Sequence, residues 1–544
     1  MQRETHARKR VEFLALLAIT TLAYIRVVGF DFSPLDDIDL IAQKLPFLSD
    51  LSNAPALFRQ PVFAFSYYRP LLTLSFMFDA VICAKPGMFH ASNLLLHLGV
   101  ITLVWRGLLL LTLPTRAAFI GAAIFALHPV QVHAIAWIPG RNDLLLAAFA
   151  LPAIGFFIQR KRGWLALHLL FYTAALLTKE NAIVIPALAL LAWWALRRTY
   201  SRKDFGPVIL GWTVITIAWW IVRARVSHQP IRDAWDIGDI VSQSAGSIVM
   251  YLGKFLLPVQ QSVMPTLEDS PLILYSIVVI SIAICATRCG LRNSRLAILG
   301  GGWLLAFLAL PVVAGATVAQ GGHLEHRLYL SSFGLIVLLA QVRWPTPKIP
   351  RRQAQILLTG VVLLALISIQ VRLRNYRDPM AFASAAVSES PSFHFGYLLR
   401  GKLHREAEPE AAVADLARAR ELAPNALAAY LEQGILFQLL GRPSDALEAY
   451  NAGLKLPIGA VSSSQMAVNV ASLHYRRSEI PQALTRYSLA TRIRPGLPEA
   501  HLGLGLCYER QGNSAAAAEA FTLALKLRPG YPAAQRGLAR TGSN

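Results

Sequence analysis

Eleven apolar stretches separated by short basic segments constrain this chain more than any other feature of its sequence. A helix that crosses a membrane needs about 20 mostly apolar residues. Only 15% of the 544 residues are charged, against about 25% in soluble domains. We therefore predict an all-α, polytopic membrane helix bundle of about eleven spans. The stretches are residues 11–30, 89–113, 116–138, 143–159, 164–178, 181–196, 206–222, 271–287, 296–316, 328–342 and 354–371.

The net charge of +21 is interpreted as a sign of membrane topology. Lys and Arg fall in short clusters between the apolar stretches, the pattern of cytoplasmic loops, so we expect no nucleic-acid partner. Arg8, Lys9 and Arg10 predict a cytoplasmic N-terminus for residues 1–10. If each of the eleven stretches crosses the membrane in turn, the C-terminus lies outside the cytoplasm. This requires that the apolar segments 68–84 and 241–257 do not cross but lie at the membrane interface or form re-entrant helices. The basic clusters that then lie inside are residues 113–116, 160–162, 197–203, 288–295 and 343–352.

The last third of the chain changes in character and repeats itself. Pro391, Pro424, Pro457, Pro495 and Pro529 recur at intervals of 33, 33, 38 and 34 residues. Small and aromatic residues recur between them at the positions typical of tetratricopeptide repeats, where small residues let two helices approach and aromatic residues fill the space between hairpins. We predict a C-terminal α-solenoid that binds protein or peptide.

These patterns divide the chain into four segments. We expect a cytoplasmic N-terminus at 1–10, a transmembrane domain at 11–371 with an extracytoplasmic loop at 31–88, a linker at 372–390 and extracytoplasmic repeats at 391–544.

Polar residues collect at the predicted outer ends of the spans. The stretch "FSPLDDID" places Asp36, Asp37 and Asp39 directly after the first span. Polar groups at a membrane edge are costly and usually functional, although each could also be a wet loop residue or an interfacial histidine. The spacing of the His residues does not suggest a metal site, and none is expected. The other groups are His90, Asn93 and His97; His128, His133, Arg141 and Asp143; Lys179 and Glu180; and His323, Glu325, His326, Arg327 and Tyr329.

Taken in order, these motifs resemble one known family over most of the chain. Besides Asp36–Asp37, the chain carries "YYRPLLTLSF" with Arg69, "FHASNLLLH", "HPVQVHAIAWIPGRND", "TKEN", "EHRLYLSSFG" and the C-terminal repeats. The sequence is similar to the transmembrane proteins with tetratricopeptide repeats that act as O-mannosyltransferases, within the GT-C class of glycosyltransferases. It departs from them at Gln131 and His133, where the family tends to have His and Glu.

The resemblance implies a polytopic enzyme that transfers a sugar, mannose in the first place, from a polyprenyl phosphate to a protein hydroxyl. Transfer would take place outside the cytoplasm, with inversion and without a cofactor or metal. Asp36 would then be the base, with Asp37 as a second contact or the alternative base. Arg327 is the first choice for the donor phosphate. Further candidates for substrate binding are Arg69, Lys179, Arg141, His90, Asn93, His128, Glu325 and Tyr329.

Two other functions remain open at this point. The chain could be a non-catalytic membrane anchor that presents repeats for envelope assembly, or a polyprenyl-linked oligosaccharide ligase or polymerase. The expected partners are a lipid-linked sugar donor, the membrane, and an acceptor or partner protein on the repeats. From the Ala-, Arg- and Leu-rich composition we expect a bacterial inner membrane rather than the endoplasmic reticulum.

Overall fold

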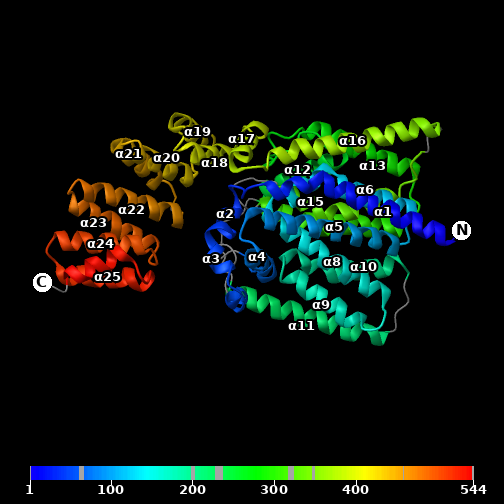
Figure 1. Cartoon of the computed structure of the whole chain (residues 1–544), viewed down its shortest axis with the longest axis horizontal. Helices are drawn as coiled ribbons and strands as arrows, with labels where there is room; N and C mark the ends of the chain where they lie inside the picture. The colour runs from blue at the N-terminus through cyan, green and yellow to red at the C-terminus, as the bar shows by residue number, and fades with distance from the viewer. Residues whose placement is uncertain are drawn as a thin grey trace. The chain divides into compact units, whose positions relative to one another are not determined.

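The computed structural model describes residues 2–59, 67–197, 202–226, 237–316, 324–345, 349–457 and 459–541. These residues form helices and loops, with one isolated bridge between Leu291 and Val342 and no longer strand among them. The chain divides into two units, Met1–Ser390 and Pro391–Asn544. Figure 1 labels the helices of both units.

The first unit begins at the N-terminus and ends after α17. Its helices are α1 (Gln2–Tyr24), η1 (Ile25–Gly29), α2 (Asp36–Leu40), η2 (Ala42–Lys44), α3 (Leu45–Leu48), η3 (Leu51–Phe58), α4 (Pro70–Ile82), α5 (Pro86–Leu110), α6 (Thr115–Leu127), η4 (Pro129–Gln131), α7 (Val132–Ala136), η5 (Ile138–Gly140), α8 (Arg141–Gln159), α9 (Trp164–Leu176), η6 (Glu180–Val184), α10 (Ile185–Ala195), α11 (Arg202–Val226), α12 (Ile237–Leu256), α13 (Leu272–Cys289), α14 (Ser294–Ala316), η7 (Glu325–Arg327), α15 (Leu328–Ala340), α16 (Arg351–Arg374) and α17 (Pro379–Glu389).

The long apolar helices of this unit confirm the prediction of a membrane helix bundle. Among the described residues six helices are long and apolar enough to cross a membrane, and the count is seven if the bent pair Thr115–Leu127 and Pro129–Ala136 is one span. The predicted spans 164–178, 181–196 and 328–342 are shorter helices, and within α14 the residues Ser294–Ala309 form a shorter apolar helix, so the count of eleven is approximate. Large apolar side chains on the outer helices point away from the protein: Ile273 on α13 is 81% exposed and Leu364 on α16 is 67% exposed. Such a surface suits lipid and would be a liability in water.

Helices in the centre of the bundle pack closely. α5 lies against α1, α6 and α8, and α14 lies against α15. Figure 1 shows α5 between α1 and α8. Gly300 on α14 faces Gly334 on α15, and a Cβ at Gly334 would lie 2.6 Å from the Gly300 carbonyl oxygen. Small residues at a crossing let two membrane helices approach to van der Waals contact.

The break between α6 and α7 has a local cause. Pro129 has no N–H to continue the helix, and the chain bends by 50° there. The Nδ1 atom of His128 accepts a hydrogen bond from the Val130 N–H at 3.2 Å, which caps the next turn. The break places the polar sequence 128–143 at one end of the bundle.

The second unit is made of helical hairpins. Its helices are α18 (His394–His404), α19 (Pro409–Leu422), α20 (Leu427–Leu439), α21 (Pro443–Leu454), α22 (Ala460–Arg476), α23 (Ile480–Ile493), α24 (Pro498–Arg510), α25 (Ser514–Leu527) and α26 (Pro532–Thr541). A Cβ at Gly434 would lie 2.2 Å from the Tyr450 ring, and one at Gly505 would lie 2.5 Å from the Phe521 ring. The small and aromatic positions therefore pack as the repeat pattern predicts. The segment 372–390, which we expect to be a linker, contains the end of α16 and all of α17 and belongs to the first unit.

Candidate active site

The two acids after the first span lie in one short helix but differ in environment. Asp37 is fully buried, and its Oδ2 atom accepts a hydrogen bond from the Ser33 N–H at 2.8 Å. Its Oδ1 atom has no hydrogen-bond partner among the described residues. Burial raises the pKa of the Asp37 carboxyl well above its usual range. Asp37 therefore closes the turn that begins at Ser33 and keeps one oxygen unused.

Asp36 is half-buried, whereas Asp39 is exposed. Burial, and then the neighbouring Asp39 carboxylate, raise the pKa of Asp36 to about 6, while the charge of Arg69 works in the opposite direction. An acid with this pKa is mostly ionised at pH 7 yet accepts a proton readily, which is the condition for a general base.

Arg69 joins this loop to the turn between α9 and α10. The Leu71 N–H donates to the Leu177 carbonyl at 3.1 Å, which brings the start of α4 to the end of α9. There the Arg69 guanidinium makes a two-pronged pair with Glu180, at 3.1 Å from Nε to Oε2 and 2.6 Å from Nη2 to Oε1. The guanidinium carbon also lies 4.2 Å from the centre of the Tyr67 ring. Such pairs fix the guanidinium plane.

Lys179 is buried in the same turn and pairs with the start of α8. Its Nζ atom lies 2.7 and 2.8 Å from the two carboxylate oxygens of Asp143 and 3.0 Å from Asn142 Oδ1. The Nε2 atom of His326 lies 3.8 Å from Asp143 Oδ2. The turn after α9, the start of α8 and the turn before α15 thus meet at one place.

The turn before α15 carries a buried ionic cluster and, beside it, a cation that pairs with no carboxylate among the described residues. Glu325 is fully buried between Lys254 Nζ and Arg372 Nη2, each 2.6 Å from one of its oxygens. Arg327, two residues later, is half-buried, and its Nη1 atom is buried without a hydrogen-bond partner among the described residues. The positive charge of Arg327 is close enough to interact electrostatically with Asp143 and His326.

Arg327 differs in this respect from the other basic side chains of the site. In the part of the chain that the structure describes, Arg69, Lys179, Lys254 and Arg372 each pair with a carboxylate, and Arg327 pairs with none. The Tyr251 hydroxyl contacts its guanidinium, and the Nη1 atom keeps its donors for an anion from outside the chain.

Three other candidates from the α5–α8 region are used inside the protein. Asn93 donates to the carbonyls of Ile135, Trp137 and Ile138 at 3.2–3.3 Å. Arg141, only 1% exposed, donates to Asn93 Oδ1 at 2.7 Å and to the Phe89 carbonyl at 2.6 Å. Its Nη2 atom also lies 2.6 Å from a carboxylate oxygen of Asp79. His90 contacts the Asp31 carbonyl at 3.3 Å. These residues hold the loop after the first span against α5 and α8.

The remaining candidates have similar internal contacts. His128 donates from Nε2 to the Phe255 carbonyl at 2.8 Å, and the Tyr329 hydroxyl lies 2.8 Å from His97 Nδ1. At the positions where the chain departs from the family, Gln131 donates to Ser332 Oγ at 3.1 Å. His133 is fully buried, and neither ring nitrogen has a hydrogen-bond partner among the described residues. Its ring centre lies 5.2 Å from that of His326.

Sequence reasoning missed Asp79, Lys254 and Arg372. Asp79 and Lys254 are single charges in apolar stretches, a signal that could have identified them because such charges are rare unless paired; Arg372 is one of several arginines at the end of α16. His323 lies outside the described residues.

Comparisons with known proteins match both the C-terminal repeats and the chain as a whole. A family described as tetratricopeptide repeat matches residues 471–532. The chain is 22% identical over 530 residues to the human protein O-mannosyl-transferase TMTC3, a match that covers 83% of this chain and 56% of the relative. The chain is similar to the protein O-mannosyl-transferases. The resemblance predicted from the sequence is confirmed, as are the C-terminal tetratricopeptide repeats.

Other matches are shorter. Human TMTC4 is 32% identical over 147 residues, or 22% of this chain and 20% of the relative. The chain spans about half the length of TMTC3. Among solved structures, MamA is 21% identical and covers 26% of this chain and 82% of its own, with a TM-score of 0.24.

Proposed function

We propose that this protein is a membrane glycosyltransferase of the GT-C class. It transfers a sugar, mannose in the first place, from a polyprenyl phosphate to Ser or Thr hydroxyls of proteins. The similarity to protein O-mannosyl-transferases over most of the chain supports the reaction class. The observation that carries the proposal is Asp36, a half-buried carboxylate with a pKa of about 6 at the end of the bundle that also holds the unpaired Arg327.

The proposed chemistry divides between these two side chains. Asp36 accepts the proton of the acceptor hydroxyl. At the same time the hydroxyl oxygen of the acceptor attacks the anomeric carbon from the face opposite the phosphate. The bond between the anomeric carbon and the phosphate oxygen breaks, and its electron pair leaves with the polyprenyl phosphate. Arg327 binds the phosphate and stabilises its growing negative charge, as fixed cations do in transition states. Inversion at the anomeric carbon follows from a single displacement.

The ion pairs around these residues have a positioning role in this proposal. Arg69 is fixed by Glu180, and its charge keeps Asp36 ionised more readily than burial alone would allow. The Lys179–Asp143 pair holds the turn after α9, which carries the Arg69 partner Glu180, against the start of α8, where the charge of Arg327 also acts on Asp143. Metal ions and cofactors have no role in this scheme.

The membrane orientation is part of the proposal. The basic clusters between the spans support a cytoplasmic N-terminus, with Asp36 and the repeats on the outer side. The repeats then present acceptor proteins, and the bacterial inner membrane is the proposed compartment. A reporter active only outside the cytoplasm, fused after the C-terminal residue, tests this; a signal only from a cytoplasmic reporter would contradict it.

The experiment that tests the activity uses purified protein in liposomes with polyprenyl-phosphate mannose and a Ser/Thr-rich peptide. Transfer is scored by the mass of the product. Asp36→Asn keeps the side-chain shape but not the basicity, so transfer should fall by about 100-fold or more. Asp39→Asn, in the same helix but exposed, is the matched control and should retain activity. Equal activity of both variants would remove the main support for the reaction.

The variant Asp37→Asn shows which of the two neighbouring acids, Asp36 or Asp37, is the base. Activity loss only in this variant would make Asp37 the base. Transfer of a preformed oligosaccharide but not of mannose would favour an oligosaccharide ligase. No transfer from any polyprenyl-linked donor by the wild-type protein would favour a non-catalytic anchor.

A further inference from the structure

A cavity of about 580 Å³ lies at the end of the bundle where the basic clusters are found. It is formed between α5, α8, α10, α14 and α15. Eight of its eighteen lining residues are leucine or isoleucine, and the aromatic residues Phe156, Trp303 and Phe333 join them. This volume falls within the range of about 300–1,000 Å³ that is usual for ligand pockets. The cavity is built from the C-terminal ends of α5 and α8, whereas Asp143 and Arg141 stand at the opposite end of α8.

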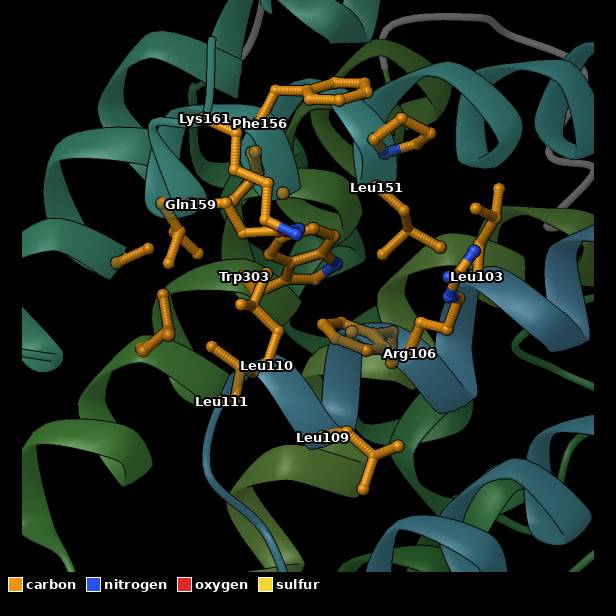
Figure 2. A pocket seen from close by; sticks show the side chains of 18 residues that line it. Leu103, Arg106, Leu109, Leu110, Leu111, Leu151, Phe156, Gln159, Lys161 and Trp303 are labelled. Carbon is orange, nitrogen blue, oxygen red and sulfur yellow. The ribbon is translucent and has the colours of Figure 1, made fainter. Parts of the chain in front are cut away.

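Three polar side chains join this apolar lining: Arg106, Gln159 and Lys161. Figure 2 shows Lys161 reaching inward from one side and Arg106 lying on the other, with leucine side chains and Trp303 between them. All three polar side chains are exposed. Neither Arg106 nor Lys161 is paired with a carboxylate among the described residues.

The local backbone explains how Lys161 reaches the cavity. α8 ends at Gln159, and Arg160 takes a left-handed conformation with φ of 50°. A left-handed residue at this place ends a helix and turns the chain. Lys161 therefore follows directly after the turn, next to the last residues of α8.

The charge around the cavity has one sign. Between Arg106 and Arg162 the sequence places five basic residues near this end of the bundle: Arg106, Arg116, Arg160, Lys161 and Arg162. The only carboxylate in the same stretch is Asp143, which lies with Arg141 at the other end of α8. A basic pocket between membrane helices on the side of the basic loops suits the head group of an anionic lipid. An apolar wall beside it suits an acyl chain, because burial of each CH₂ is favourable.

We propose that this cavity is a binding site for an anionic membrane phospholipid, whose phosphate lies between Arg106 and Lys161 and whose acyl chain lies along α5 and α8. The lipid fills the space between α8 and α14 and stabilises the bundle. This phospholipid is distinct from the sugar donor, and its binding does not depend on the transferase reaction.

The test compares two lipids that share acyl chains. The purified protein is stripped of lipid in detergent and titrated with dioleoyl-phosphatidylglycerol or dioleoyl-phosphatidylcholine, and binding is followed by native mass spectrometry and by the thermal unfolding midpoint. Phosphatidylglycerol should bind and raise the midpoint, and phosphatidylcholine should do so much less. Equal effects of the two lipids would overturn the head-group assignment. Binding of a polyprenyl phosphate in preference to phosphatidylglycerol would overturn the choice of occupant.

Two variants with matched controls locate the site. Arg106→Gln/Lys161→Gln should weaken phosphatidylglycerol binding about 30-fold, since each basic residue near a membrane surface contributes about fivefold in affinity. The control is Arg116→Gln, an exposed arginine of the same basic end that does not line the cavity. Unchanged affinity of the double variant, or an equal loss in the control, would refute the proposal.

The second variant fills the apolar part of the cavity without changing charge. A Cβ at Gly155 would have no atom nearer than 3.8 Å, so Gly155→Leu extends into the open space. Its control is Gly99→Leu on α5, where a Cβ would meet nothing within 4 Å and the residue does not line the cavity. Gly155→Leu should lose lipid binding while its lipid-free unfolding midpoint stays at or above that of the wild type. Undiminished binding in Gly155→Leu would place the lipid elsewhere.

Discussion

Replacement of Glu325 by Gln should show what holds the ionic cluster before α15 together. The Oε1 atom of Glu325 lies 2.6 Å from Lys254 Nζ and accepts from the Ser262 N–H at 3.2 Å, and Oε2 lies 2.6 Å from Arg372 Nη2. All these groups are buried. Glu325→Gln keeps the shape of the side chain but leaves two buried cations without a counter-charge.

The size of the effect follows from the pKa of Glu325. Burial disfavours the charged carboxylate, but Arg372 and Lys254 outweigh it and lower the pKa from 4.5 to about 2. A tenfold difference in proton affinity between the unfolded and the folded state corresponds to about 1.4 kcal/mol. The ionised carboxylate therefore contributes about 3 kcal/mol to the free energy of unfolding at pH 7. This agrees with the roughly 3–5 kcal/mol lost when one partner of a buried pair is removed. Because the pKa is lowered on folding, the contribution is complete above about pH 4.5 and is lost as the pH falls towards 2.

The measurement is equilibrium unfolding in mixed micelles, followed by tryptophan fluorescence. Glu325→Gln should lower the free energy of unfolding by about 3 kcal/mol at pH 7. Arg377→Gln is the matched control, since the Arg377–Asp378 pair belongs to the same unit but its Arg side chain is 68% exposed; exposed pairs contribute about 0.2–1 kcal/mol. Adding Lys254→Met to Glu325→Gln restores the net charge of the cluster and should recover part of the loss. Equal losses in Glu325→Gln and Arg377→Gln would refute the reasoning.

Three further predictions concern the proposed site and the repeats. Because burial and Asp39 raise the pKa of Asp36 to about 6, kcat/KM for transfer should fall about tenfold per pH unit below pH 6, and a flat profile from pH 7 to 5 would exclude Asp36 as base. Arg327→Ala should weaken donor binding by about 10- to 100-fold through loss of a charged hydrogen bond, with partial recovery in Arg327→Lys because Lys cannot donate from a planar fork; the readout is the donor KM, with the unfolding midpoint as the check on structure. Gly434→Ala should cost about 1–3 kcal/mol, since its Cβ would lie 2.2 Å from the Tyr450 ring, whereas the Cβ of Gly496→Ala would meet nothing within 4 Å. Amide exchange in α20 and α21 measures the first variant and exchange in α23 and α24 the second; an equal loss of protection in both would contradict the packing argument.

The repeats were predictable from the sequence because their contacts are local and periodic. Gly434 and Tyr450 are 16 residues apart, and their close approach repeats in the next hairpins as Gly505 with Phe521. The apolar helices were predictable for a similar reason, since length and composition decide whether a helix can cross a membrane. Helix lengths were less certain: the predicted stretch 164–178 is a helix from Trp164 to Leu176, too short to cross unaided.

The pairing of charges in the candidate site could not be predicted. Arg69 and Glu180 are 111 residues apart, and the Leu71–Leu177 hydrogen bond that aligns their two segments leaves no trace in sequence spacing. The sequence predicts Arg141 as a possible phosphate ligand because it is basic and lies at the outer end of a predicted span. In the structure its guanidinium is occupied by Asn93 and the Phe89 carbonyl, which only the folded chain reveals.

The pairing pattern suggests how a membrane protein can keep many charges and still leave two of them reactive. Unpaired charges in a low-dielectric environment are costly, so Arg69, Lys179 and Arg372 are each matched to a carboxylate inside the protein. These pairs fix the turns around the site but are already satisfied, and a substrate would gain little from them. Asp36 and Arg327 lie among the pairs without a matching partner of their own in the described chain. The incoming hydroxyl and phosphate of the proposed reaction are the groups that would complete them, which is the expected arrangement when binding energy is reserved for the transition state.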